Sequence, residues 1–353
     1  MDSSAPTAPL KVSSNMAMRK FSIALAGSLL LAAGFSSCMK YEKKTNTPTS
    51  GTTTLVCDNT FENIFEQEVD VFEYQYPDAH ILVRYGTQSE ALDSLFSMNT
   101  RTVVITRDLT QEEKRALKAK YKQERNTNVN VRSAKIAVDA VALIVNPANT
   151  VNKVTVNEVA DILSGETPNW NDLEPSKLGA IKVVVDKSGS SLATYLTDSI
   201  LGGRPLAPNV FEAGSIPEVF KAVEADKNAI GVLGVSWITS DMDSADISTE
   251  DLAKTMLSDG AVTSPDLTQK VKVLAVNRND EVRAYKPYQQ YIFDGSYPLF
   301  RQIYMITTAS TSNVAGGFYS FVTGPTGQKI IMKTGILPAR VSIQQVELVG
   351  GEE

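Results

Sequence analysis

The sequence predicts an α/β fold, and three observations lead to this prediction. Strand-like runs at Leu55–Cys57, His80–Tyr85 and Thr102–Thr106 alternate with amphipathic helical patterns, which is typical of a parallel sheet covered on both faces. The length of 353 residues suggests about two domains. A hydrophobic content of 42% and a charged content of 21% are ordinary for a globular protein.

The first helices are predicted from their caps and their apolar faces. Asp58-Asn59-Thr60 supplies N-cap chemistry for a helix that carries Phe61, Ile64, Phe65, Val69 and Phe72 on one face. A second helix begins near Thr87, after a turn at Tyr76–Ala79. Thr110 and Glu113 form a capping box for a third helix that runs to about Glu124.

Two long apolar segments are predicted to cross between two lobes. They are Ala134–Pro147 and Tyr297–Ile306. The elements expected between and after them are helices at 155–163 and 216–225, strands at 230–234 and 271–276, a closing helix at 318–333 and a final turn or strand at 335–338. Asp241–Gln269 is polar and is expected to be irregular.

The N-terminal segment resembles a bacterial lipoprotein signal. Met18-Arg19-Lys20 is a positive region, Phe21–Phe35 is an apolar stretch too short to span a bilayer comfortably, and Ser36-Ser37 precede Cys38. This resemblance implies that the signal peptide, within residues 1–37, is removed and that Cys38 is lipidated. Met16 or Met18, just before the positive region, would be a more usual translation start than Met1. An ordinary secretory peptide with an incidental cysteine is the alternative.

Residues 38–54 are predicted to form a flexible tether between the lipid and the fold, because Met39–Thr54 is charged and then rich in Thr, Ser and Pro. The expected location is the bacterial cell envelope, on the periplasmic side of a membrane. Cys57 then has no disulfide partner, and its strand-like run predicts a small buried hydrophobe.

Charge and residue counts argue against several functions. A net charge of −6 disfavours a nucleic-acid partner, which binds a basic face. The single histidine, His80, follows a turn, so a Ser-His-Asp triad or a multi-histidine metal site is not expected. We predict no enzyme activity, no metal and no cofactor.

Val183–Leu196 (VVVDKSGSSLATYL) is the segment that most suggests a ligand site. A strand that feeds a serine-rich loop at a helix start presents N–H groups and hydroxyls to one point, and such a point binds anions. The alternative is that these serines are plain N-caps.

Four further segments, taken with this loop, resemble a known family. In order they are VDAVALIVNPAN (138–149), VTVNEVADILSGETPNWNDL (154–173), NAIGVLGVSWI (228–238) and YPLFRQIYMIT (297–307). From about Leu55 to Pro338 the chain resembles the phosphate-binding proteins of ABC uptake systems, in the periplasmic-binding-protein-like domain family, and its N-terminal pattern is similar to a lipoprotein branch.

The resemblance implies a two-lobed, type II (Venus-flytrap) α/β fold with two crossover strands. Residues 55–138 and 300–345 would form the first lobe, and residues 139–299 the second. The implied function is capture of inorganic phosphate between the lobes by a monomer that delivers it to an ABC permease in the membrane. The resemblance maps phosphate contacts to Asp58, Asn59, Thr60, Ser89, Thr106, Arg107, Ser190 and Ser191, and Asp186, in the same loop as the two serines, is predicted as a further contact.

Three positions depart from the family pattern. Asp186 stands where many members have arginine, Leu192 where they have threonine, and Arg101 where they have aspartate. One interpretation is a redistributed charge set, in which Arg107 or Arg101 supplies the cation and Asp58 or Asp186 accepts the proton of hydrogen phosphate. Another is a changed ligand, so that the chain binds or senses another oxyanion or small solute.

Several of these residues also have purely structural explanations. Asp58, Thr60 and Ser89 serve equally well as helix caps, and Arg107 as a surface ion pair. Trp170 and Trp237 are assigned to packing, and Arg301 to a hinge or an inter-lobe pair. A serine hydrolase using Ser188, Ser190 or Ser191, with Lys187 as its partner, is the least favoured function.

Overall fold

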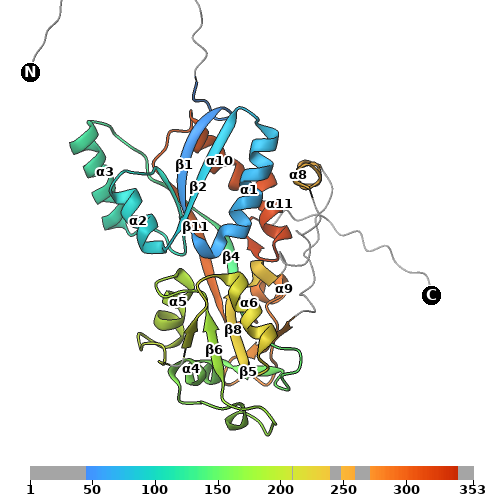
Figure 1. Ribbon diagram of the computed structural model, residues 1–353. Helices are drawn as coiled ribbons and strands as arrows, with labels where there is room; N and C mark the ends of the chain where they lie inside the picture. The colour runs from blue at the N-terminus through green and yellow to red at the C-terminus, as the bar shows by residue number, and fades with distance from the viewer. Residues whose placement is uncertain (1–44, 209, 239–247, 259–270, 341–353) are drawn as a thin grey trace, which may run out of the picture. The chain divides into compact units, whose positions relative to one another are not determined.

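One mixed sheet runs through the part of the chain that the computed structural model describes, which is residues 45–208, 210–238, 248–258 and 271–340 (Figure 1). Its strands follow the order β2-β1-β3-β11-β4-β8-β6-β7. The predicted signal peptide and the proposed lipid site at Cys38 lie outside the described residues. No helix among the described residues is long and apolar enough to cross a membrane.

The first lobe is built on three parallel strands. They are β1 (Gly51–Asp58), β2 (Ala79–Gly86) and β3 (Thr102–Ile105). Figure 1 shows α2 (Gln88–Phe96) and α3 (Gln111–Arg125) to one side of them and α1 (Glu62–Gln75), α10 (Val314–Val322) and α11 (Pro325–Lys333) to the other. The alternation of parallel strands and helices confirms the predicted α/β class.

The second lobe continues the sheet with β8 (Ala229–Gly234), β6 (Lys182–Val185) and β7 (Val210–Glu212). Its helices include α4 (Val156–Ser164), α5 (Ser191–Tyr195) and α6 (Ile216–Ala225), and α5 continues directly into a π-helical turn, η3 (Leu196–Ile200). Smaller elements complete it: β5 (Lys153–Thr155), η2 (Trp170–Asp172), β9 (Lys272–Val273), β10 (Ala275–Asn277) and α9 (Gln289–Phe293).

Two strands carry the chain from one lobe to the other, as predicted. β4 (Arg132–Val145) pairs with β11 (Phe300–Thr307) and β12 (Leu337–Pro338) through Ala140, and with β8 from Val141 onward. The expected lobe boundary lay two residues earlier, between positions 138 and 139. This arrangement confirms the predicted two-lobed fold with two crossover strands.

The predicted tether is wrong from residue 45 onward. Strand β1 begins at Gly51, four residues before the expected start at Leu55. Ahead of it, Asn46 Oδ1 accepts a hydrogen bond from the Val314 N–H at 2.9 Å, and Pro48 lies so close to Gly317 that no side chain would fit there. The Thr-rich composition misled because threonine is also a good strand former.

Two further predictions need correction. The irregular stretch expected at 241–269 contains α8 (Thr249–Leu257), which Ser248 caps; the parts of that stretch at 241–247 and 259–269 lie outside the described residues. The single closing helix is in fact α10 and α11. Gly324 and Pro325 separate them, because proline has no N–H to continue the first helix and is well suited to begin the second.

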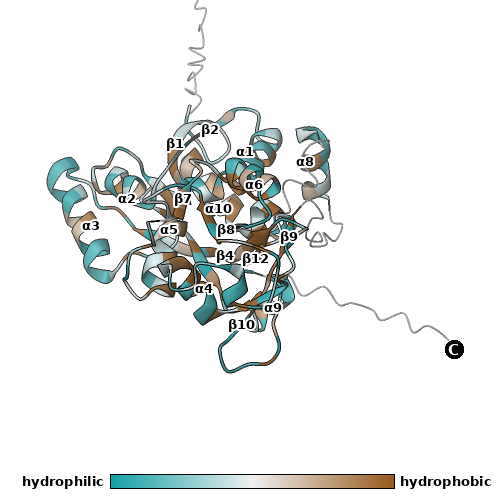
Figure 2. Cartoon of the chain, turned by 60° about the horizontal axis from the view of Figure 1, so that its bottom comes forward, coloured by the Kyte–Doolittle hydropathy of each residue, from teal (hydrophilic) through white to brown (hydrophobic). Residues whose placement is uncertain are grey.

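Hydropathy follows the layers of the fold (Figure 2). Helix α3 is hydrophilic apart from the side that buries Leu117 and Tyr121, whereas the strands are hydrophobic. Cys57 is a free, fully buried cysteine, and burial raises the pKa of its thiol well above the ordinary value. This burial matches the small hydrophobe predicted for Cys57.

Glu68 is a buried carboxyl group on α1. Its side chain is fully buried, and neither of its oxygens has a hydrogen-bond partner among the described residues. Burial raises the pKa of this carboxyl well above its ordinary value. The folded chain therefore retains a proton on Glu68 in a pH range where the unfolded chain has lost it.

Glu68→Gln is expected to remove a pH-dependent loss of stability. The stability that protonated Glu68 contributes is fully present below the unfolded pKa of about 4.3 and is lost as pH rises through the higher folded pKa. As pH rises from 5 to 8, the free energy of unfolding of the variant should therefore fall less than that of the wild type. Urea unfolding measures this difference. An equal difference for Glu66→Gln, at an exposed position of the same helix, would contradict it.

The crossover strands are joined by a buried ion pair. Arg301 of β11 lies opposite Asp139 of β4 in the strand register, and its Nε and Nη2 donate to Asp139 Oδ2 at 3.1 and 2.9 Å. Both side chains are almost completely buried. Gly234 makes room for the pair, because a Cβ there would lie 2.5 Å from Asp139 Oδ2.

Arg301→Gln and Asp139→Asn are each expected to destabilise the fold by about 3–5 kcal/mol, because each leaves a buried charge unpaired. The double variant should lose less than the sum of the two, by about 1 kcal/mol or more. Urea unfolding of all four proteins measures the coupling. The surface pair Arg204–Glu166 is the control, and Arg204→Gln should cost about 1 kcal/mol or less. Additive losses at Arg301 and Asp139 would contradict the pairing.

Candidate functional site

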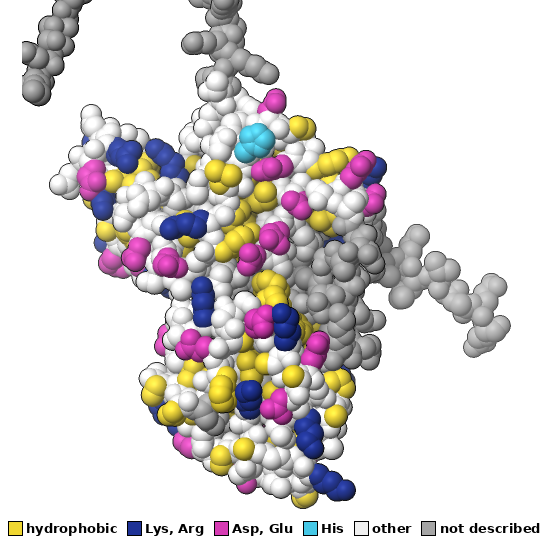
Figure 3. All heavy atoms as spheres, in the orientation of Figure 1, with side chains coloured by type: hydrophobic (Ala, Val, Ile, Leu, Met, Phe, Trp, Pro, Cys, Tyr) yellow, Lys and Arg dark blue, Asp and Glu magenta, His cyan; other side chains and the backbone are white. Residues whose placement is uncertain are grey.

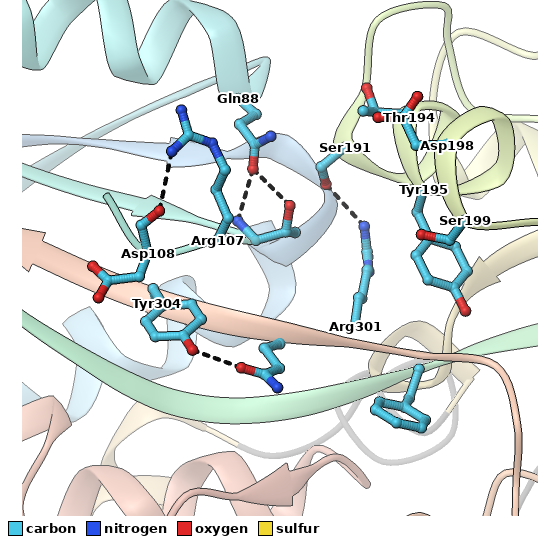
Figure 4. A pocket seen from close by; sticks show the side chains of 13 residues that line it. Gln88, Arg107, Asp108, Ser191, Thr194, Tyr195, Asp198, Ser199, Arg301 and Tyr304 are labelled. Carbon is cyan, nitrogen blue, oxygen red and sulfur yellow. Dashed lines mark hydrogen bonds between the residues drawn. The ribbon is translucent and has the colours of Figure 1, made fainter. Parts of the chain in front are cut away.

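A polar cavity of about 410 Å³ lies where segments of both lobes meet, which is within the size range of small-molecule sites (Figure 4). Its walls come from α2, the end of β3, α5 with η3, and β11. The lining residues are Gln88, Thr106, Arg107, Asp108, Ser191, Thr194, Tyr195, Asp198, Ser199, Phe300, Arg301, Gln302 and Tyr304.

Hydrogen bonds connect the two lobes beside this cavity. Arg301 Nη1 donates to Ser191 Oγ at 2.8 Å, and Ser191 Oγ lies 3.2 Å from Thr60 Oγ1. Thr60 Oγ1 donates its one proton to Asp58 Oδ1 at 2.6 Å, so Ser191 must donate to Thr60. The result is a chain of hydrogen bonds, here called the relay, in which Arg301 donates to Ser191, Ser191 to Thr60 and Thr60 to Asp58.

Arg301 is the buried cation of this region. Its side chain is 2% exposed, its guanidinium carbon lies 4.7 Å from the centroid of the Phe61 ring, and Asp139 holds two of its N–H groups. A guanidinium has five N–H donors, so two remain after the bonds to Asp139 and Ser191. The sequence predicted an inter-lobe pair here, and the bond to Ser191 is one. It also brings Arg301 to the cavity wall, which the sequence did not predict (Figure 4).

Asp58, Asn59 and Thr60 form the first predicted contact loop, between β1 and α1. Asp58 Oδ1 accepts from the N–H of Thr60 at 3.0 Å and so caps the 3-10 turn η1 (Asn59–Phe61). Trp237, assigned to packing from the sequence, also donates from Nε1 to the Thr60 carbonyl at 2.8 Å. Asp58 Oδ2 and Asn59 Oδ1 are buried and have no partner among the described residues.

The serine loop lies at the end of β6. Gly189 has a φ of +75°, which lets the loop turn toward α5. Ser190 caps α5 by accepting from the Ala193 N–H at 3.0 Å, and its hydroxyl donates to Asp186 Oδ1 at 2.8 Å. Asp186 Oδ2 is buried and unpartnered within the described chain.

Burial is the main cause of the raised pKa of Asp186. The N–H of Lys187, the Ser190 hydroxyl and the charge of Arg301 lower this pKa in part, and the negative charge of Asp58 raises it further. The influence of Asp58 on Asp186 places the two predicted carboxylates in one electrostatic environment. The structure therefore brings together five predicted site residues: Asp58, Thr60, Asp186, Ser190 and Ser191.

Two predicted residues of the first lobe line the cavity but have partners of their own. Thr106 donates from its N–H and its hydroxyl to Gln88 Oε1, at 2.9 and 2.6 Å. Arg107 is bidentate to Glu113, at 2.8 and 2.7 Å, with 40% of its side chain exposed. The guanidinium of Arg107 is therefore already neutralised, which favours the structural explanation for this residue.

Two residues are not where the sequence analysis placed them. Ser89 is exposed and lies outside the cavity, because the capping box at the start of α2 is made by Thr87 and Glu90. Arg101 is also exposed, and its guanidinium lies 5.7 Å from the centroid of the Tyr121 ring. Arg101 is therefore not the cation of the cavity.

Sequence reasoning missed most of the cavity wall beyond the serine loop. Ser191, Thr194, Tyr195, Asp198 and Ser199 recur at i, i+3, i+4, i+7 and i+8, the spacing of one helical face. This signal was present in the sequence, because these residues follow the predicted anion loop directly. Gln302 and Tyr304 of β11, whose side chains hydrogen-bond to each other at 2.6 Å, gave no comparable signal.

The serines lack the partners that nucleophilic catalysis needs. Within the described residues, the hydroxyls of Ser190 and Ser191 bond to no histidine or lysine side chain. His80 is exposed and faces Glu73 at 3.9 Å. Among those residues there is also no group of three or more His, Cys, Asp and Glu side chains placed to hold a metal ion.

Three relatives are similar to most of the chain. It is 23% identical over 97% of its length to the phosphate-binding protein PstS of Pseudomonas aeruginosa, whose whole length is matched, and 22% identical over 82% of its length to PstS of Bacillus subtilis, of which 81% is matched. A substrate-binding protein of Clostridium perfringens, solved with bound phosphate, superposes with a TM-score of 0.61 at 20% identity, over 82% of this chain and all of the other.

A second solved structure and a family model agree with these similarities. The ABC-type phosphate transport receptor of Vibrio cholerae superposes with a TM-score of 0.57 at 17% identity, over 81% of this chain and 99% of the other. Residues 42–326 match the family model described as a PBP superfamily domain. This match covers well over half of the sequence, and the two-lobed fold agrees with it. The chain therefore belongs to the family that this model describes, the PBP superfamily domain.

Proposed function

We propose that this chain captures inorganic phosphate between its two lobes and delivers it to an ABC permease. The observation that carries the proposal is the buried group formed by Arg301, Ser191 and Thr60, with the unpartnered carboxylate oxygens of Asp58 and Asp186 beside it. It unites a cation, hydroxyls and acceptors from both lobes. Hydrogen phosphate needs all three kinds of partner.

The physics of such a site is desolvation offset by hydrogen bonds. A buried anion is tolerated only when charge-assisted donors satisfy its oxygens. The two remaining N–H groups of Arg301 are such donors, and the hydroxyls of Ser191 and Thr60 join them if a ligand displaces their mutual contact. Phosphate would thus replace the contact between the lobes and connect them through its own oxygens.

Asp58 and Asp186 would select the ligand by its protons. A carboxylate oxygen accepts the O–H of hydrogen phosphate, whereas fully ionised sulfate has no proton to give and would meet buried like charge. Both residues have an oxygen free for this role. Under this proposal Asp139 stays bound to Arg301 and only orients it.

The names of the related proteins support the transport part of the proposal. The two curated relatives are named phosphate-binding proteins, and the Vibrio cholerae structure is named an ABC-type phosphate transport receptor. We extend this role to the present chain as a binding protein without catalytic activity, at the periplasmic side of the bacterial cell envelope.

Lysines and arginines are interspersed with aspartates and glutamates on the face shown in Figure 3, where no single basic patch stands out.

A different small solute is the alternative ligand. Three buried carboxyl groups lie near the guanidinium of Arg301: Asp139 bonds to it, Asp186 feels its charge, and Asp58 is connected to it through Ser191 and Thr60. This excess of negative charge favours a ligand that offers several O–H or N–H donors. Calorimetric titration with phosphate and sulfate distinguishes phosphate from such a solute.

Phosphate affinity tests the proposal directly. The detergent-solubilised full-length chain, unfolded and refolded to remove carried-over ligand, should bind phosphate in calorimetric titration and should not bind sulfate. Arg301→Gln should weaken phosphate binding by about a hundredfold or more, because losing a hydrogen bond to a buried charge costs about 2–5 kcal/mol. Ser191→Ala should weaken it less, by about tenfold.

Arg101→Gln is the matched control, because Arg101 is exposed and lies away from the cavity. It should leave the phosphate affinity unchanged. No heat with phosphate or sulfate would reject phosphate capture and leave the other-solute alternative. Release of phosphate or alcohol from a phosphomonoester or ester substrate would instead support the serine hydrolase alternative.

The processing and anchoring of the N-terminus can be tested separately. We propose that residues 1–37 form a signal peptide and that Cys38 carries the lipid that anchors a monomeric protein to the membrane. Mass spectrometry of the protein from its native membrane should give an N-terminal peptide that begins at Cys38 and carries acyl chains. Cys38→Ala should release the chain from the membrane fraction. Processing at another site without acyl mass would support the ordinary secretory peptide.

A further inference from the structure

The two carboxylates beside the relay each have one oxygen occupied and one free. Asp58 Oδ1 accepts from Thr60, and Asp186 Oδ1 accepts from Ser190, at 2.6 and 2.8 Å. The second oxygen of each is buried and has no donor in the described part of the chain. Since leaving a buried acceptor without a donor is unfavourable, two such oxygens at one site indicate a ligand that brings two protons.

The charges around this pair lead to the same conclusion. Asp58, Asp139 and Asp186 would carry three negative charges against the one positive charge of Arg301. A doubly charged anion would add to this excess in a region of low dielectric. A singly charged anion with two O–H groups would add less charge and would satisfy both free oxygens.

The other ionisable groups near the pair do not remove this imbalance. Arg301 of β11 and Asp139 of β4 neutralise each other. Lys187 and Glu62 are partly buried and opposite in charge: burial raises the pKa of Glu62, the charge of Lys187 lowers it in part, and the two groups offset each other. Cys57 and Tyr195 are kept neutral, because burial raises the pKa of both, that of Tyr195 to about 12.

We propose that the bound complex holds two protons, one shared with Asp58 and one with Asp186, so that the chain captures dihydrogen phosphate in preference to the dianion. This inference rests on the proposed function. It makes Asp186 a specificity-determining residue, because its free oxygen supplies the second acceptor. No bond is made or broken, and the protons come from solvent as the ligand enters the closed site.

The test is calorimetric titration of the full-length chain with inorganic phosphate from pH 5.5 to pH 8.5, in pairs of buffers with different enthalpies of ionisation. Above the second ionisation of phosphate the association constant should fall about tenfold per pH unit. Each phosphate bound at pH 8.5 should take up about one proton from the buffer, and none at pH 5.5. An association constant that is flat or rises with pH would overturn the proposal while leaving phosphate capture intact.

Variants locate the two protons. Asp58→Asn and Asp186→Asn each remove one acceptor carboxylate, so each should abolish the proton uptake at pH 8.5 and flatten the pH dependence. Glu62→Gln removes a nearby charge that contacts neither carboxylate, and it should leave both properties unchanged. Flattening by Glu62→Gln would attribute the effect to general charge and overturn the proposal. The wild-type proton uptake decides the question even if an aspartate variant does not fold.

Perchlorate distinguishes selection by net charge from selection by O–H groups, because it is a tetrahedral anion with one charge and no O–H group. It should not compete with phosphate at pH 6. Competition by perchlorate would overturn the two-proton complex and show that the site selects a single charge. If phosphate itself gives no heat at any pH, the proposed function fails and this inference fails with it.

Discussion

The buried pair between Arg301 and Asp139 is the contact on which the rest of the structure depends. It joins the only two strands of the described sheet that connect the lobes, and it does so next to the position where β4 exchanges β11 for β8. Asp139 fixes the guanidinium with two of its five N–H groups, which leaves the others directed to Ser191 and the cavity. Under the proposed function, the side chain that joins the two crossover strands is also a donor to the ligand.

This dual use explains why the lobes meet through polar atoms. Ser191 and Thr60 come from loops that follow parallel strands, β6 and β1, where backbone direction brings loop residues to one edge of the sheet. Their hydroxyls connect Arg301 to Asp58 without burying an unpaired donor. Such a contact is weaker than an apolar interface, so a ligand with better donors and acceptors can replace it.

Much of the fold could be predicted from the sequence because its signals are local. Capping boxes at Thr110 and Thr155 and the apolar run of β4 gave helices and a crossover close to where they occur. The early start of β1 could not be predicted, because its threonines read equally well as a tether and as a strand. Docking of Asn46 and Pro48 on α10 is a tertiary contact that leaves no local pattern.

The sequence predicted the loop residues that the structure brings together, and it did not predict that a residue of a crossover strand joins them. Asp58, Thr60, Asp186, Ser190 and Ser191 lie together because each caps or adjoins a helix start that the sequence marks. Arg301 has no such mark, because its burial opposite Asp139 and its bond to Ser191 are tertiary contacts that leave no local pattern in the sequence. A buried cation on a crossover strand thus reaches the serine loop through the fold and not through a local motif, which is why sequence patterns alone did not point to it.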